Sequence, residues 1–100
     1  MKIAIAQMNA MVGDMHGNAE KIIHYAQEAH LQGAQLLVTP ELALCGYPPE
    51  DLLYRDDFMA ANERALQHIC ENIPSELSLL IGHPHKSKGQ LFNAATLIQG

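Results

Sequence analysis

Basic residues are scarce in this chain of 100 residues, which has six lysines and arginines against eleven aspartates and glutamates. The formal net charge of −5 argues against nucleic acid or an anionic membrane as a partner, because both are bound through clustered Lys and Arg. Charged residues of both signs make up 17% of the chain, which is somewhat low. This shortfall suggests that other protein covers more of the surface than usual.

Cysteine is scarce as well. Cys45 and Cys70 are the only two, and no CxxC spacing occurs, which excludes a disulfide scaffold and favours reduced thiols in a cytosolic protein. We interpret Cys45 as a small packing residue and Cys70 as part of a helix core. No apolar run approaches the length of a signal-peptide core or a membrane span. We therefore expect a cytoplasmic location.

Two kinds of ligand-binding pattern are missing. Gly13 and Gly17 are spaced wrongly for a GxGxxG motif or a Walker loop. His83 and His85 stand two residues apart without a third ligand nearby, so the sequence does not indicate a zinc site. None of the six histidines is placed as a base for a nucleophile. We expect neither a metal nor a cofactor in this segment.

What the chain does contain is an alternation of strand-like and helix-like segments. Asn18 and Gly33 predict the start and stop of a first helix, while Asp56 or Asp57 and Pro74 bound a second one. Strands are expected over 2–8, 35–39, 77–82 and 91–98, the last two joined by a polar linker over 83–90. The resulting β-α-β-α-β-β order predicts an α/β fold with two parallel crossovers and a final antiparallel hairpin.

Glu41 occupies the most informative position. Pro40 ends the apolar strand before it, so Glu41 follows the carboxyl end of a strand, where open α/β sheets place their ligands. Partial burial there raises the pKa of a carboxyl group toward the range that a general base needs. The alternative is a carboxylate that caps a backbone N–H or pairs with an arginine, and the strand-end position alone does not decide between them.

Four stretches carry a family resemblance. They are residues 3–9 with 12–14 and Asn18, residues 33–42 around Pro40-Glu41-Leu42, residues 45–53 with the run GYPPEDLL, and residues 80–82 with 91–95. Together they resemble the nitrilase-type carbon–nitrogen hydrolases, and the GYPPEDLL run is typical of the glutaminase domains of glutamine-dependent NAD synthetases. The resemblance covers the whole chain in register.

The resemblance implies an α-β-β-α sandwich and the hydrolysis of a glutamine amide, with Glu41 as general base and Tyr47 beside the substrate. The alternative for Tyr47 is a loop side chain packed on Pro48. The family's nucleophilic Cys and its oxyanion-stabilising Lys match positions beyond Gly100, so the chain alone should be inactive. The released ammonia would serve the ATP-dependent amidation of deamido-NAD, with ATP and Mg²⁺ held by a synthetase domain.

The expected partners are glutamine, the rest of the same polypeptide and further copies in a homo-oligomer. We expect residues 1–100 to be the amino-terminal part of an incomplete domain, since the fourth strand runs almost into the chain end. One alternative is a stand-alone amidase or carbamoylase. Another is a small non-catalytic flavodoxin-like binding module, which predicts a closed monomer, whereas a fragment should expose apolar sheet.

Overall fold

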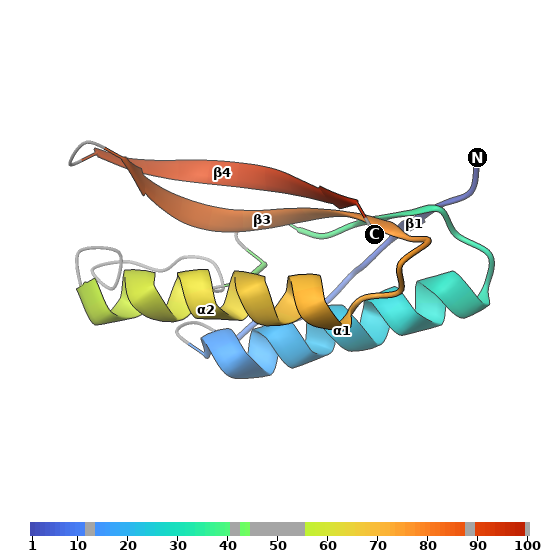
Figure 1. Ribbon diagram of the computed structural model, residues 1–100, viewed down its shortest axis with the longest axis horizontal. Coiled ribbons are helices and arrows are strands. Elements are labelled where there is room, and N and C mark those ends of the chain that lie inside the picture. The colour runs from blue at the N-terminus through green and yellow to red at the C-terminus, as the bar shows by residue number, and fades with distance from the viewer. Residues whose placement is uncertain (12–13, 41–42, 45–55, 88–89, 100) are drawn as a thin grey trace.

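The computed structural model of the chain describes residues 1–11, 14–40, 43–44, 56–87 and 90–99. Its elements are β1 (Ile3–Ile5), α1 (Met15–Leu31), β2 (Leu36–Val38), α2 (Asp56–Asn72), β3 (Ser78–Ser87) and β4 (Gln90–Gln99). This confirms the predicted β-α-β-α-β-β order. Figure 1 shows the two helices side by side beneath one sheet.

Helix α1 begins earlier than its sequence predicts. Asp14 is the N-cap, and its Oδ1 accepts a hydrogen bond from the backbone N–H of Gly17 at 2.9 Å. The prediction that Asn18 caps the helix is wrong. It arose because the sequence around Gly17 is typical of a loop, which placed the expected start of the helix after Gly17. A Cβ atom at position 17 would collide with the Asp14 carboxylate, so glycine at this position permits the hydrogen bond between Asp14 and the Gly17 N–H. Asn18 lies inside the helix and is fully buried.

Helix α1 ends where Gly33 predicts. Gly33 has a φ of 86°, a left-handed conformation that glycine adopts without a steric penalty. The Gly33 N–H donates to the His30 carbonyl at 3.0 Å, and the Ala34 N–H donates to the Ala29 carbonyl at 2.9 Å. These two bonds form a Schellman motif, which satisfies carbonyls that a helix end leaves open.

The strands form one mixed sheet in the order β1-β2-β3-β4. The pairs β1–β2 and β2–β3 are parallel, and β3–β4 is antiparallel, as predicted. Strand β1 is limited to Ile3–Ile5, shorter than expected. Strand β3 continues to Ser87 through the segment predicted as a linker. Since β2 pairs with β3 only as far as Leu80, Pro84 lies where β3 has one partner strand, and proline is tolerated there.

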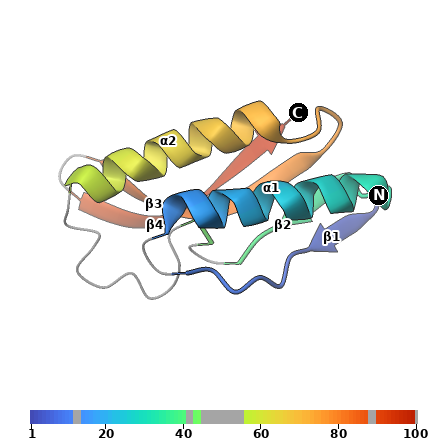
Figure 2. The ribbon, with the colours of Figure 1, turned by 90° about the horizontal axis from the view of Figure 1, so that it is seen from below.

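Both helices cover the same face of the sheet (Figure 2). Leu37, Leu79 and Ile81 are buried on this face, where they meet the apolar sides of the helices. The predicted stripe of α1 is buried throughout: Ala19, Ile22, Ile23, Ala26 and Ala29. From α2 the buried residues are Phe58, Asn62, Ala65 and Ile69. The core therefore lies between one sheet face and one layer of helices.

The opposite face of the sheet is apolar as well. The strand register aligns Ile5, Val38, Leu80 and Leu97 in one row, because partnered residues in a sheet share a face. Ile5 is 71% exposed and Leu97 is 53% exposed. Within the described part of the chain, no element covers this row, which we call the open face.

One cysteine prediction is wrong, and the other is not tested. Cys70 is exposed rather than part of the core. It follows the fully buried Ile69, and successive helical residues are rotated by about 100°, so Cys70 turns away from the sheet. Cys45 lies outside the described residues. Neither described helix is long and apolar enough to span a bilayer.

Candidate active site

The carboxyl ends of the parallel strands β1, β2 and β3 lie at the same end of the sheet, and α1 begins at this end too (Figure 2). The residues predicted from sequence as general base and substrate contact, Glu41 and Tyr47, lie outside the described residues. Pro40 before this position, and Ala43 and Leu44 after residues 41–42, are described. They define where the backbone enters and leaves that position.

Thr39 fixes the entry side to β3. Its backbone N–H and its hydroxyl both donate to the Leu80 carbonyl, at 3.0 and 3.1 Å. The same hydroxyl accepts a hydrogen bond from the Gly82 N–H at 3.2 Å. Since Pro40 has no N–H to donate, the hydroxyl carries the pairing with β3 one step beyond β2. The backbone is therefore held against β3 up to the residue before Pro40.

Ala43 and Leu44 fix the exit side. The Ala43 N–H donates to the Pro40 carbonyl at 3.2 Å. The Leu44 N–H donates to the Gly82 carbonyl at 3.2 Å. Ala43 is 1% exposed and Leu44 is 0% exposed. Entry and exit are thus both attached to the same stretch of β3.

Asn18 joins this exit side to the loop after β1. Its Nδ2 donates to the Met11 carbonyl at 2.8 Å and to the Leu44 carbonyl at 3.0 Å. Its Oδ1 accepts a hydrogen bond from the Met11 N–H at 2.8 Å. We call Asn18, Thr39, Leu44 and Gly82 the strand-end frame. This role of Asn18 was not predicted from the sequence, although Asn18 stands four residues before the buried Ile22 on the apolar side of the helix.

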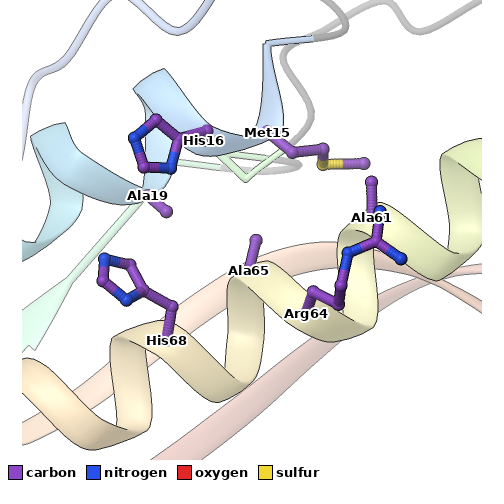
Figure 3. A pocket seen from close by; sticks show the side chains of 7 residues that line it. All are labelled: Met15, His16, Ala19, Ala61, Arg64, Ala65 and His68. Carbon is purple, nitrogen blue, oxygen red and sulfur yellow. The ribbon is translucent and has the colours of Figure 1, made fainter.

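A separate groove lies between α1 and α2 (Figure 3). It has a volume of about 300 Å³ and is lined by Met15, His16, Ala19, Ala61, Arg64, Ala65 and His68. The ring centroids of His16 and His68 are 6.1 Å apart, and His68 Nε2 lies 2.6 Å from Glu20 Oε1. An exposed pair of this kind is worth less than about 1 kcal/mol. We interpret the groove as a space left where α1 packs against α2.

The two histidines of β3 differ in burial. His83 is 4% exposed, and its Nε2 lies 2.6 Å from the Thr96 hydroxyl, whereas His85 is exposed. Among the described residues, no group of three or more His, Cys, Asp or Glu side chains is placed to hold a metal ion. The expectation of a metal-free segment stays a prediction.

Residues 2–100 match the carbon–nitrogen hydrolase family model. The glutamine-dependent NAD(+) synthetase of Synechocystis sp. is 45% identical over 104 residues, which cover 97% of this chain and 19% of that protein. The solved glutamine-dependent NAD+ synthetase of Acinetobacter baumannii superposes with a TM-score of 0.91 at 31% identity, over 97% of this chain and 18% of that one.

A solved amidase from Nesterenkonia sp. is also similar, with a TM-score of 0.79 and 31% identity. The match covers 97% of this chain and 37% of the amidase. The chain therefore spans about a fifth of the synthetases and less than two fifths of the amidase.

Proposed function

The chain belongs to the carbon–nitrogen hydrolase family, and on this basis we propose that it is the amino-terminal part of the glutaminase domain of a glutamine-dependent NAD synthetase. The observation that carries the proposal is the agreement with synthetases along nearly the whole chain, at 45% identity in sequence and a TM-score of 0.91 in structure. The activity is proposed for a protein of which residues 1–100 form a part.

In this proposal Glu41 takes the proton of a cysteine thiol that the longer protein supplies. The thiolate attacks the amide carbon of glutamine, and a lysine, also from the longer protein, offsets the charge on the carbonyl oxygen. Glu41 passes this proton to the amide nitrogen as the C–N bond breaks, so that ammonia leaves, and water then hydrolyses the thioester to glutamate and the free thiol. Tyr47 would border the substrate.

The proposal also assigns the other components of the reaction. Ammonia passes to an ATP-dependent amidation of deamido-NAD, with ATP and Mg²⁺ bound by a synthetase domain rather than by this segment. The partners are glutamine, the rest of the same polypeptide and further copies of it in a homo-oligomer. The proposed location is the cytoplasm.

The open face supports the proposal that residues 1–100 form part of a larger domain. A row of aliphatic side chains from all four strands faces outward, and large exposed apolar patches mark interaction surfaces. In an α-β-β-α sandwich, a second sheet would cover this row. We propose that the longer protein supplies that sheet.

The test replaces the matching segment of the Synechocystis synthetase with residues 1–100 and measures ammonia release from glutamine. We expect the chimera to hydrolyse glutamine and its Glu41→Gln variant to lose this activity, while NAD synthesis from added ammonia continues in both. Loss of glutaminase activity in the unaltered chimera, or its survival in Glu41→Gln, would contradict the proposal. The 100-residue chain alone should release no ammonia.

The likeness to the Nesterenkonia amidase favours a second candidate, a stand-alone amidase. A variant of that amidase carries the acetamide moiety of fluoroacetamide covalently at its active-site cysteine. Simple amides distinguish the two functions: faster turnover of acetamide than of glutamine by the complete protein would favour the amidase.

A flavodoxin-like binding module fits the structure less well. Doubly wound folds of that kind carry helices on both faces of the sheet. Here both described helices cover the same face (Figure 2).

A further inference from the structure

We propose that Asn18 is a positioning residue for the general base, acting through the backbone of Leu44. This inference rests on the proposed function, since it gives Glu41 the role of base. Leu44 follows Glu41 by three residues and is the last described residue on the exit side. Its N–H is bound to β3 through the Gly82 carbonyl at 3.2 Å, and its carbonyl is bound to α1 through Asn18 Nδ2 at 3.0 Å. The backbone at Leu44 is therefore held from two sides.

The hydrogen bonds of Asn18 require an amide side chain. Two N–H groups donate to the carbonyls of Met11 and Leu44, and the amide oxygen accepts from the Met11 N–H. An alanine would leave those three backbone groups without this partner, and an aspartate would turn a carboxylate oxygen toward two carbonyl oxygens. Burial of a polar group costs free energy unless its hydrogen bonds are made. Asn18 is 0% exposed and makes all three.

A structural role alone would predict a different result from a positioning role. A purely structural residue changes the amount of folded protein, but each folded molecule keeps its turnover number. A positioning residue changes turnover in protein that is still folded, because a shift of about 1 Å in a catalytic group can cost a hundredfold in rate. The two roles are separated by kcat measured per folded molecule.

The matched control is Ile22→Ala. Ile22 lies one turn after Asn18 on the same helix and is also 0% exposed, but an isoleucine side chain makes no hydrogen bond. Truncation of a buried isoleucine destabilises a protein substantially. This control therefore lowers stability in the same helix without removing a hydrogen bond of the strand-end frame.

The experiment uses the chimera with the Synechocystis synthetase and compares it with Asn18→Ala, Asn18→Asp and Ile22→Ala. NAD synthesis from added ammonia reports the intact synthetase part, and circular dichroism reports the folded fraction. We expect kcat for glutamine hydrolysis to fall about ten- to a hundredfold in both Asn18 variants, with a small change in KM. In Ile22→Ala, we expect kcat per folded molecule to equal that of the parent.

The outcomes separate this inference from the proposed function. An unaltered chimera without glutaminase activity, or an active Glu41→Gln variant, would contradict the function itself. With those controls as expected, an unchanged kcat in the Asn18 variants would overturn the positioning role. Equal losses of kcat in Ile22→Ala, or failure of both Asn18 variants to fold, would assign Asn18 a structural role only and would also overturn it.

Discussion

Substitution of Ile5 by lysine tests whether the open face becomes an interior surface. Full burial of an isoleucine side chain stabilises a protein by about 1.5–3 kcal/mol. Because Ile5 is 71% exposed in this chain, the chain by itself realises less than about 1 kcal/mol of that stabilisation. Ile5→Lys should therefore shift the urea unfolding midpoint of the 100-residue chain only slightly.

In the longer protein the same change should be severe. If a second sheet covers the open face, Ile5→Lys removes the whole burial term and places an ammonium group in an apolar interface. The penalty for an unpaired buried charge is several kcal/mol, out of a total stability of about 5–15 kcal/mol. We expect the chimera with the Synechocystis synthetase to unfold at a much lower temperature or to become insoluble.

Leu31→Lys is the matched control. Leu31 is 85% exposed and lies at the end of α1, where a cationic side chain is favourable. It carries the same charge change on the helix side of the molecule. Urea unfolding followed by circular dichroism measures the 100-residue chain, and thermal unfolding measures the chimera. If Ile5→Lys lowers the unfolding temperature of the chimera no more than Leu31→Lys does, the open face is not covered and the incomplete-domain proposal is wrong.

Two further predictions concern local hydrogen bonds, and both are checked by the urea midpoint of the 100-residue chain. Thr39→Val keeps the shape of the side chain but leaves the Gly82 N–H without its hydroxyl acceptor, which should cost about 1–3 kcal/mol; Thr39→Ser should stay close to the parent, and equal losses in both would argue against the hydroxyl. Asp14→Ala removes the N-cap contact to Gly17 and should cost about 0.5–2 kcal/mol, while Asp14→Ser should recover most of it. An unchanged midpoint in Asp14→Ala would show that this cap contributes nothing.

The order of elements was predictable because its signals are local. The apolar spacing of α1 and the glycine at position 33 act within a few residues, and the structure confirms both the buried stripe and the helix end. The parallel and antiparallel pairings follow from the lengths of the connections. These features need no knowledge of distant contacts.

The predictions that failed depend on contacts between distant segments or on the exact phase of a helix. The sequence favours Asn18 as a cap because asparagine is common there, but its partners Met11 and Leu44 lie seven and 26 residues away. The extension of β3 depends on pairing with β4, which tolerates the polar residues of 83–87. Cys70 lies next to the buried Ile69, and a stripe defined only by spacing does not separate such neighbours.

In the proposed function, residues 1–100 and the rest of a longer polypeptide each contribute part of the active site. The hydrogen bonds of the frame bind Thr39 and Leu44 to β3 and bind Leu44 to α1, so this segment holds the backbone before and after residues 41–42. In the proposed function, the longer protein supplies the nucleophile and the lysine, and it also supplies the sheet that would cover the open face. Ile5→Lys should therefore disrupt the docking of that part and the folded protein with it. The Asn18 variants should leave a folded protein whose base is misplaced, so the two sets of variants fail in different ways.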